Sequence, residues 1–365
     1  MADVIEISRV EELIEYRLAW ESLLSETPGA SFFHSLDWLR AYWEHFGKQK
    51  RLRVLVVLDE GRPLGMVPLV LRRERTRLGW LRVLGYPLDD WGSFYGPIGP
   101  APEQTLVHAL AWIKAGPADW DLLELRGIEA ESPADRATAS AFEAAGYPAL
   151  RTLWNRTALL DFSGEWETYL AGRSAKWRSN YRRLERRLQW HGKVEHIRYR
   201  PAGEVGSTFD PRWDLYDACE AVARRSWQAE STTGITLCHE SVRPFLRDAH
   251  QAACRRGEVD LNLLCLEGQP IAFAYNYVRQ GRLYGLRSGY DAAVAPLGAG
   301  TVLLAWMLRD SFHRKDTLLD LGFTSLELKR PVATRMVDAV RYSHFGPSAR
   351  AQVLRVKRWI QQYAF

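Results

Sequence analysis

A glycine-rich turn is the sharpest local feature of the sequence. It closes the segment of residues 289–301, and its last four residues are Gly298, Ala299, Gly300 and Thr301. A β-like run precedes the turn and an apolar helical run follows it, so the first amides of a helix would point at one spot. Such a turn can hold a pyrophosphate without a side-chain cation, although plain strand-to-helix turns also use glycine. The spacing is neither that of a Walker loop nor that of a Gly-x-Gly-x-x-Gly fingerprint.

A basic helix is the second candidate. Residues 173–193 contain eight Lys and Arg but only one Glu. Apolar residues spaced by four, three and four positions predict one buried stripe, which consists of Trp177, Tyr181, Leu184 and Leu188. Lys176, Arg178 and Arg182 flank this stripe and are candidate ligands for phosphate, a phosphosugar or an RNA backbone. The alternative is a solvated basic face that pairs with the acidic remainder of the chain.

Carboxylates in two other segments could transfer protons. Asp320 ends a β-like run that leads to Glu327 and Lys329, which together offer a proton acceptor and a cation. Asp89 and Asp90 are adjacent in a loop rich in glycine and aromatic residues. One carboxylate could raise the pKa of the other toward neutrality and make it a general base. Taken singly, both aspartates are also ordinary turn-formers or helix caps.

Several chemistries lack a matching pattern. The four cysteines, at positions 219, 238, 254 and 265, form no Cys-x-x-Cys pair, and there is no His-Glu-x-x-His sequence. We therefore expect no metal and interpret the cysteines as reduced core residues. Nucleophilic catalysis is not indicated either, because Gly-x-Ser-x-Gly is absent.

Composition and charge narrow the class of protein. The chain has 365 residues, of which 47% are hydrophobic and 25% charged, which suits two folded domains rather than disorder. Its longest apolar run, residues 302–308, is far shorter than the ~18–20 residues of a membrane helix. With no signal-peptide pattern at the start, we expect a cytoplasmic protein without a membrane span. A second basic zone, residues 329–365, has eight Lys and Arg against one Asp. Because the positive charge is confined to two zones, we favour a local site for an anionic ligand over a protein whose whole surface binds nucleic acid.

The elements that must position these residues occur in an order that runs twice. In each half, helices precede an antiparallel hairpin, and then a further helix and a further strand follow. The predicted helices include residues 36–46 in the first half and residues 174–190, 210–227, 241–256, 301–313 and 349–363 in the second. The strands predicted in the second half are residues 260–266, 271–279, 282–288, 317–321 and 337–345. This order predicts two α/β domains of similar plan that meet near residues 150–165.

Short motifs along nearly the whole chain occur in a recognisable order. They are Phe32-Phe33, Gly65-Met66-Val67-Pro68, Asp90-Trp91, Gly268-Gln269-Pro270, Gly289-Tyr290-Asp291 and Asp320-Leu321-Gly322 with Lys329. In this order, and with the basic helix from Lys176, the chain resembles the acetyltransferase-like proteins of bacterial cellulose and exopolysaccharide clusters (the CelD/BcsL type). These belong to the GNAT superfamily and are relatives of the Fem-type peptidyltransferases.

The resemblance implies a fold class and a division of the chain. The class is α/β (layered α+β), with tandem GNAT-like (acyl-CoA N-acyltransferase) domains whose mixed, mostly antiparallel sheets are flanked by helices. The expected domains are residues 1–160 and residues 161–365, the second carrying the donor-binding turn. The GNAT donor loop has Arg or Gln, two residues, Gly, one residue, and then Gly or Ala. Gly298 and Gly300 match this pattern, whereas Ala295 replaces its polar first residue.

The resemblance also implies an activity. We expect an acyltransferase that moves an acyl group from acetyl-CoA or another acyl-CoA to an amine or hydroxyl of an anionic small-molecule, glycan or peptide acceptor, in exopolysaccharide or cell-envelope biosynthesis. The turn from Gly298 to Thr301 would hold the donor, and Lys329 would orient the acceptor. Asp90 or Glu327 would be the base and Tyr290 the acid. A Fem-like transferase that uses aminoacyl-tRNA and a non-catalytic binding protein are the alternatives.

Overall fold

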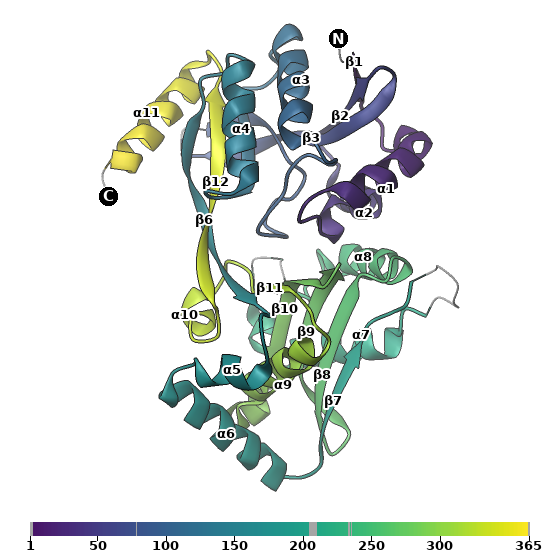
Figure 1. The fold of residues 1–365 in the computed structure, drawn as a ribbon, viewed down its shortest axis with the longest axis vertical. Helices are drawn as coiled ribbons and strands as arrows, with labels where there is room; N and C mark the ends of the chain where they lie inside the picture. Colours follow the sequence, from purple (N-terminus) through teal and green to yellow (C-terminus); the bar gives the residue numbers. More distant parts are fainter. Residues whose placement is uncertain (1–2, 78, 204–209, 233, 235, 364–365) are drawn as a thin grey trace. The chain divides into compact units, whose positions relative to one another are not determined.

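The structure is a computed structural model that describes residues 3–77, 79–203, 210–232, 234 and 236–363. It divides into two compact units (Figure 1). Unit 1 comprises Met1–Thr157 and Val337–Phe365, and unit 2 comprises Ala158–Met336. The expected boundary at residue 160 differs from this division, because it leaves the C-terminal segment in the second half. The segment belongs to unit 1 since strand β12 (Arg335–Phe345) pairs antiparallel with β5 (Leu122–Glu129) over residues 339–345.

Unit 1 is built on a mixed sheet with the strand order β1-β2-β3-β4-β5-β12. Its first four strands are antiparallel neighbours, whereas β4 and β5 are parallel. These four strands are β1 (Asp3–Ile7), β2 (Arg51–Asp59), β3 (Arg62–Thr76) and β4 (Gly79–Gly85). The main helices of the unit are α1 (Arg17–Glu26), α2 (Leu36–Phe46), α3 (Pro102–Ala115), α4 (Pro133–Ala144) and α11 (Ala349–Tyr363).

Unit 2 repeats this plan with the strand order β7-β8-β9-β10-β11-β6. Again the first four strands are antiparallel, the next pair is parallel, and an antiparallel strand from another part of the chain follows. The strands are β6 (Leu150–Asp161), β7 (Val194–Tyr199), β8 (Val259–Leu266), β9 (Gln269–Arg279), β10 (Arg282–Tyr290) and β11 (Leu318–Asp320). The helices are α5 (Trp166–Ala171), α6 (Ala175–Trp190), α7 (Trp213–Arg224), α8 (Arg243–Arg255), α9 (Ala299–His313) and α10 (Leu326–Lys329). The predicted repetition of elements is therefore confirmed as one sheet topology used twice.

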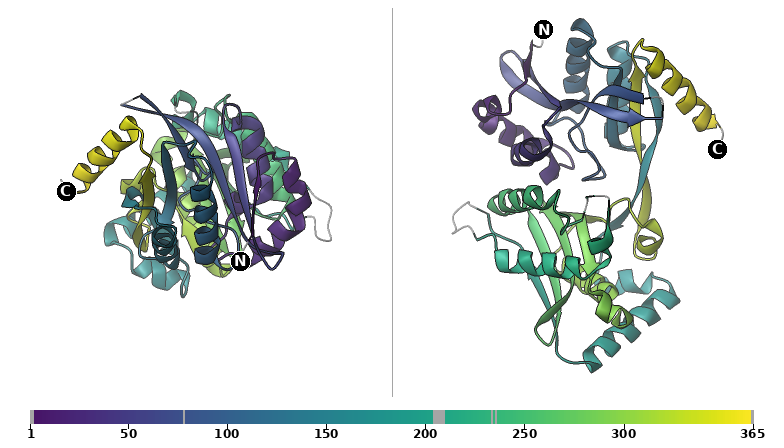
Figure 2. Two further views of the ribbon diagram at one scale, coloured as in Figure 1. Left: turned by 90° about the horizontal axis from the view of Figure 1, so that it is seen from above. Right: turned by 180° about the vertical axis from the view of Figure 1, so that it is seen from behind.

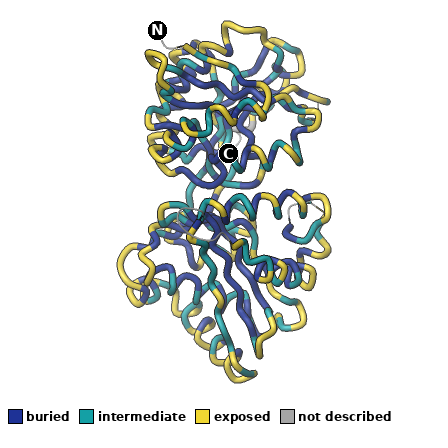
Figure 3. The backbone as a smooth tube through the Cα atoms, turned by 90° about the vertical axis from the view of Figure 1, so that its right-hand side faces the viewer, coloured by how far each residue is buried: buried dark blue, intermediate teal, exposed yellow. Residues whose placement is uncertain are grey.

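The sheet of unit 2 is covered on both faces. Along β9, Ala272, Ala274 and Val278 belong to the core that contains the apolar residues of α6 and α9. The intervening Tyr275 points the other way, where its hydroxyl is 2.9 Å from His250 Nδ1 of α8 and its ring packs edge-on against Tyr216 of α7. Since successive side chains of a strand alternate between faces, α6 and α9 cover one face and α7 and α8 the other (Figure 2). The central strands of the unit are accordingly buried along most of their length (Figure 3).

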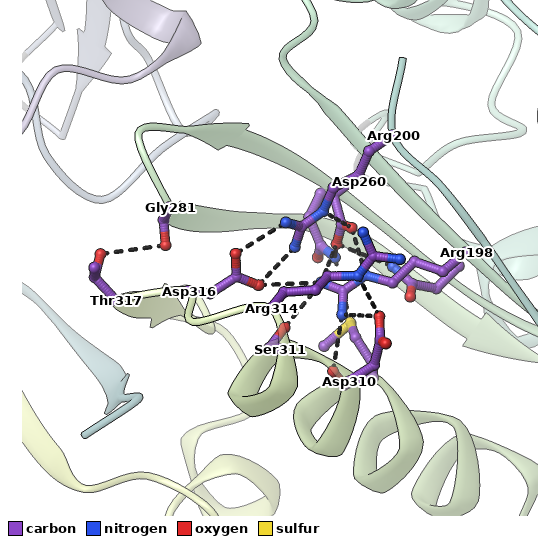
Figure 4. A network of polar contacts seen from close by, with 12 residues as sticks. Arg198, Arg200, Asp260, Gly281, Asp310, Ser311, Arg314, Asp316 and Thr317 are labelled. Atoms are coloured by element: carbon purple, nitrogen blue, oxygen red, sulfur yellow. Dashed lines mark hydrogen bonds and ion pairs between the residues drawn. The ribbon is translucent and has the colours of Figure 1, made fainter. Parts of the chain in front are cut away.

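A buried network of charged side chains ties β7 and β8 to helix α9 (Figure 4). Asp260 on β8 is fully buried and accepts hydrogen bonds from Arg198 Nε and Arg200 Nε, both at 2.7 Å. Arg198 also contacts Asp310 of α9 at 2.9 Å, and Arg200 contacts Asp316 at 2.7 Å. Although burial alone would raise the pKa of Asp260, the two arginines lower it to about 2. The network therefore holds α9, whose first turn is the predicted donor turn, against the sheet in a fixed register.

Candidate functional site

The parallel strands β10 and β11 separate after a short pairing. They are paired only between residues 282–284 and residues 318–320, whereas β10 continues to Tyr290 with β9 as its neighbour. A bulge interrupts β10 between Gly285 and Arg287, and beyond Asp320 the chain turns toward β6, where Leu321 N donates to Ala158 O at 2.9 Å. Within the described residues, the second half of β10 thus has a strand partner on one side only. Such an edge offers backbone amides and carbonyls to an extended ligand.

Polar groups gather where the strands separate. The Asp320 side chain is buried, and its Oδ1 accepts from Gly322 N at 2.8 Å. Gly322 O in turn accepts from Lys329 Nζ at 3.2 Å. A Cβ on Gly285, at the bulge, would lie only 3.1 Å from Asp320 O, so this position requires glycine for the close approach of the two strands. The carboxylate of β11 and the ammonium of Lys329 are therefore held on one short segment at the end of β11.

The environment of Lys329 changes its acidity. Burial lowers its pKa to about 8, with a further lowering by Arg287 and an opposing effect of Asp320. Arg287 is itself buried enough that its pKa falls to about 10. An ammonium group with a pKa of about 8 is mostly charged at neutral pH and can release its proton at small cost, which suits a group that stabilises or transfers charge.

A short 3-10 helix, η4 (Ala292–Leu297), connects β10 to the predicted donor turn. Gly298 has φ 71°, a left-handed conformation that favours glycine, and its carbonyl accepts from Thr301 N and Val302 N to start α9. Ala299 and Gly300 are the first two residues of α9, and no intrahelical carbonyl can reach their amides. These amides lie at the positive end of the helix dipole. The turn is thus built as an anion site can be, as the sequence indicated.

The two glycines of this turn also have packing roles. A Cβ on Gly298 would lie 2.6 Å from Leu184 Cδ1 of α6, and one on Gly300 would lie 3.0 Å from Tyr290 Cδ1. A side chain at either position would push Leu184 or the Tyr290 ring aside, so glycine favours this close packing whether or not a ligand binds. The same contacts bring the basic helix and the predicted acid Tyr290, which is 41% exposed, against the donor turn.

The basic helix α6 packs as its apolar spacing predicted. Tyr181, Leu184 and Leu188 are buried, and Trp177 is half-buried and stacks on Tyr181. The one carboxylate on the helix, Glu185, accepts from Tyr181 Oη and Trp306 Nε1 instead of from an arginine. Among the residues described, no carboxylate lies within 4 Å of the cationic atoms of the three predicted ligands: Lys176, Arg178 and Arg182.

The start of α6 is also fixed to the segment that follows Lys329. Arg173 Nη1 donates to Ala333 O at 2.7 Å, and Tyr169 Oη of α5 donates to Val332 O at 2.6 Å. Unit 2 therefore brings the donor turn, Tyr290, the basic helix and the Lys329 segment into one set of packed elements.

Neither of the two predicted bases, Glu327 and Asp90, is among the groups described above. Glu327 is exposed on α10 and makes no hydrogen bond or ion pair with other described residues. Asp90 belongs to unit 1, where burial raises its pKa and the adjacent Asp89 raises it further. Asp89 accepts from Tyr42 Oη at 2.7 Å and lies 3.3 Å from Lys50 Nζ, so its charge is compensated. The sequence offered Glu327 as a candidate base because it lies in the segment between Asp320 and Lys329. In the structure, however, Asp320 is the buried carboxylate of that segment.

Unit 1 has a counterpart of Asp320. Glu124 pairs with Gly85 in the same register in which Asp320 pairs with Tyr284, and each acid follows two leucines. Although burial alone would raise the pKa of Glu124, Arg126 and Arg358 hold it well below the usual range. The charge of Glu124 is thus compensated by arginines. Its equivalent in unit 2, Asp320, instead lies near Lys329, whose pKa is lowered. This equivalence was not predicted, because it depends on strand register.

Comparisons with known proteins agree with this topology. Residues 175–330 match the family model described as an acetyltransferase (GNAT) domain. No curated protein sequence matched the chain. Among solved structures, FemX matches with a TM-score of 0.63 at 10% identity, over 96% of this chain and 99% of that chain.

Two further structures are similar. The C-terminal domain of a putative lysylphosphatidylglycerol synthetase from Agrobacterium fabrum has a TM-score of 0.52 at 12% identity, over 95% of both chains. A tandem GNAT protein from the clavulanic acid biosynthesis pathway has a TM-score of 0.49 at 14% identity, over 95% of this chain and 100% of that chain.

The fold is therefore a tandem GNAT-like fold of mixed, mostly antiparallel sheets flanked by helices. The match of residues 175–330 to the acetyltransferase (GNAT) domain model agrees with the resemblance drawn from the sequence. No helix in the described residues is both long and apolar enough to cross a membrane.

Proposed function

We propose that the chain is an acyltransferase that moves an acyl group, with acetyl as the first candidate, from acyl-CoA to an amine or hydroxyl acceptor. The observation that carries this proposal is the separation of β10 from β11 in the unit that contains the match to the GNAT acetyltransferase domain, with the donor turn at the end of the short 3-10 helix that follows β10. An extended donor could pair with the free edge of β10 while its phosphates meet the first turn of α9.

The residues present fit such a co-substrate. The amides of Ala299 and Gly300 would hold the pyrophosphate, and the packing of Leu184 against Gly298 places the basic helix α6 beside this turn. Ala295 contributes no polar side chain, so the backbone amides would carry the binding. When bound, the thioester would supply the activated acyl carbon.

Lys329 and Tyr290 are the groups of unit 2 proposed to handle charge and protons in the reaction. With a pKa of about 8, the Lys329 ammonium would stabilise negative charge on the acyl oxygen and orient the acceptor. Tyr290 would donate a proton to the departing thiolate. The two candidates for the base are Asp90, whose pKa is raised by burial, and the exposed Glu327. Asp320 would hold Lys329 in place through the Gly322 backbone.

The acceptor we propose is anionic. The cations Lys176, Arg178 and Arg182 would bind its phosphate or carboxylate groups, and the CelD/BcsL resemblance suggests a glycan or peptide of exopolysaccharide or envelope biosynthesis. The alternative donor is aminoacyl-tRNA, since the fold is that of FemX and α6 presents a basic surface. Binding of tRNA would weaken steeply with salt, whereas binding of a thioester to backbone amides would not.

Calorimetry with acetyl-CoA, a longer acyl-CoA and charged tRNA tests the proposal. We expect acyl-CoA binding by the wild type and its loss in Gly300→Val, because the added side chain would displace the Tyr290 ring and cover the amides. Gly96→Val is the matched control, since no atom lies within 4 Å of the added Cβ and the backbone φ is not positive. Absence of acyl-CoA binding by the wild type, or unchanged binding by Gly300→Val, would refute the donor assignment.

A further inference from the structure

The outward face of the C-terminal helix α11 carries an apolar stripe. Its members, Val353, Val356 and Ile360, are 51%, 51% and 54% exposed and line an open hollow together with Gln352 and Lys357. The three positions recur with the period of a helix, so they form a continuous line along α11. Isolated exposed apolar residues are common in folded proteins, but a stripe along one helix marks a surface for binding.

The stripe is not part of the face that packs on unit 1. Ala351 and Leu354 are buried against Leu81, Val83, Leu122 and Phe345. Arg358 extends from the same side toward the buried Glu124 and donates to Ser343 Oγ at 2.9 Å. At 100° per residue, Val353, Val356 and Ile360 lie on the opposite side of the helix from Ala351 and Leu354. Helix α11 is thus apolar on two faces, of which one is covered by the sheet of unit 1.

The charge of the helix indicates what the second face binds. Residues 346–365 contain four cations and no carboxylate. Arg358 is used internally, but Arg350 and Lys357 flank the stripe, and within the described part of the chain neither lies within 4 Å of a carboxylate. An apolar stripe flanked by cations is the pattern of a helix that lies in the interface of an anionic bilayer.

From this pattern we infer that α11 docks the protein on an anionic membrane surface, with Val353, Val356 and Ile360 in the headgroup region and Arg350 and Lys357 near lipid phosphates. The helix has 15 residues, fewer than the ~20 needed to cross a bilayer, and one face is committed to unit 1, so it would lie on the surface. A second copy of the chain fits less well. A two-fold interface would bring Arg350 and Lys357 of both copies together, and three side chains provide far less than the ~800 Å² per partner of a stable dimer.

Sedimentation of the full chain with extruded vesicles tests this inference. The probes are vesicles of phosphatidylcholine alone and of equal parts phosphatidylcholine and phosphatidylglycerol, at low and high salt. We expect at least tenfold tighter binding to the anionic vesicles, weakened by salt. The triple variant V353S/V356S/I360S should lose at least tenfold of this binding, and R350E/K357E should lose the preference for anionic lipid. Leu18→Ser, which removes an apolar side chain that is 86% exposed on α1, is the control and should bind as the wild type does.

Circular dichroism and light scattering complete the test. The substituted side chains are exposed, so the variants should keep the wild-type helix content. Equal binding to both vesicle types, or undiminished binding of a folded triple variant, would overturn the inference. So would a dimer that the triple variant converts to a monomer without any effect of lipid, because the stripe would then serve a second copy. Should the triple variant not fold, R350E/K357E and the salt dependence still decide the question.

Discussion

The buried network around Asp260 makes a quantitative prediction for stability. In Asp260→Asn, the fully buried carboxylate that accepts from Arg198 and Arg200 is replaced by a neutral amide of similar shape. The pKa of Asp260 is lowered from 3.8 to about 2, which corresponds to about 2 kcal/mol of stability at neutral pH. The amide also turns an acceptor oxygen into a donor that faces Asn262 Nδ2 and Asn276 Nδ2.

The stability lost in Asp260→Asn should be less than the ~5 kcal/mol that breaking a buried ion pair can cost. Arg198 keeps Asp310 at 2.9 Å and Arg200 keeps Asp316 at 2.7 Å, so neither arginine is left buried without a counter-charge. We therefore expect Asp260→Asn to lower the free energy of unfolding by about 2–4 kcal/mol at pH 7. Because the folded-state pKa is below the unfolded one, this stability is present above about pH 4 and is lost as the pH falls through 2. Nearly half of the wild-type advantage should be gone at pH 3.

Urea unfolding followed by tryptophan fluorescence, at pH 7 and pH 3, measures this difference. Asp214→Asn is the matched control, since Asp214 pairs with Arg212 at 2.8 Å but is 63% exposed, and it should cost less than about 1 kcal/mol. The reasoning fails if the two variants lose the same stability, or if the deficit of Asp260→Asn is the same at both pH values.

Three further outcomes concern the proposed site. Lys329→Met should lower kcat for acyl transfer at least tenfold. It should also remove a change in rate centred near pH 8, because burial lowers the pKa of Lys329 to about 8. pH–rate profiles measure both effects, and Lys315→Met, at an exposed lysine, is the control. Asp90→Asn should lower kcat with little change in acyl-CoA affinity, whereas Glu327→Gln should leave kcat within twofold; steady-state kinetics would contradict this order if Glu327→Gln were the slower enzyme. The triple variant K176A/R178A/R182A should raise the KM of an anionic acceptor at least tenfold and reduce the salt dependence of that KM. Its melting temperature should stay within about 2 °C of the wild type, because among the described residues these cations have no carboxylate partner to lose. An unchanged KM would instead mean that the cations of α6 form a solvated face.

Local periodicity predicted most of the helices and strands. The helices expected at 36–46 and 349–363 have those bounds in the structure, and the buried stripe of α6 is the one that its spacing indicated. Two edge strands, β1 and β7, were not predicted. Both are short and have few buried residues, so their strand conformation depends on pairing with β2 and β8 rather than on a pattern of their own.

The exchange of strands between the halves could not be predicted either. β12 closes the sheet of unit 1 beside β5, and the end of β6 closes the sheet of unit 2 beside β11. These pairings join residues far apart in the sequence, such as Ala339 with Glu129 and Leu318 with Asp161, and a β-strand carries no local mark of its partner. The division of the chain at residue 160 follows sequence order and so differs from the compact units.

The sequence by itself determined the class of this protein: its apolar periods produce the repeated order of helices and strands, and Gly298 and Gly300 predict the turn at the start of α9. Only the tertiary structure decided which polar residues act together. Asp320 and Lys329 have ordinary side chains until burial lowers the pKa of Lys329 to about 8. Glu124 has no distinct role until Arg358, from a distant segment, joins Arg126 of its own strand to neutralise it. The reason is physical. Secondary structure arises from interactions over a few residues, whereas desolvation and charge pairing depend on everything that the fold packs around a group.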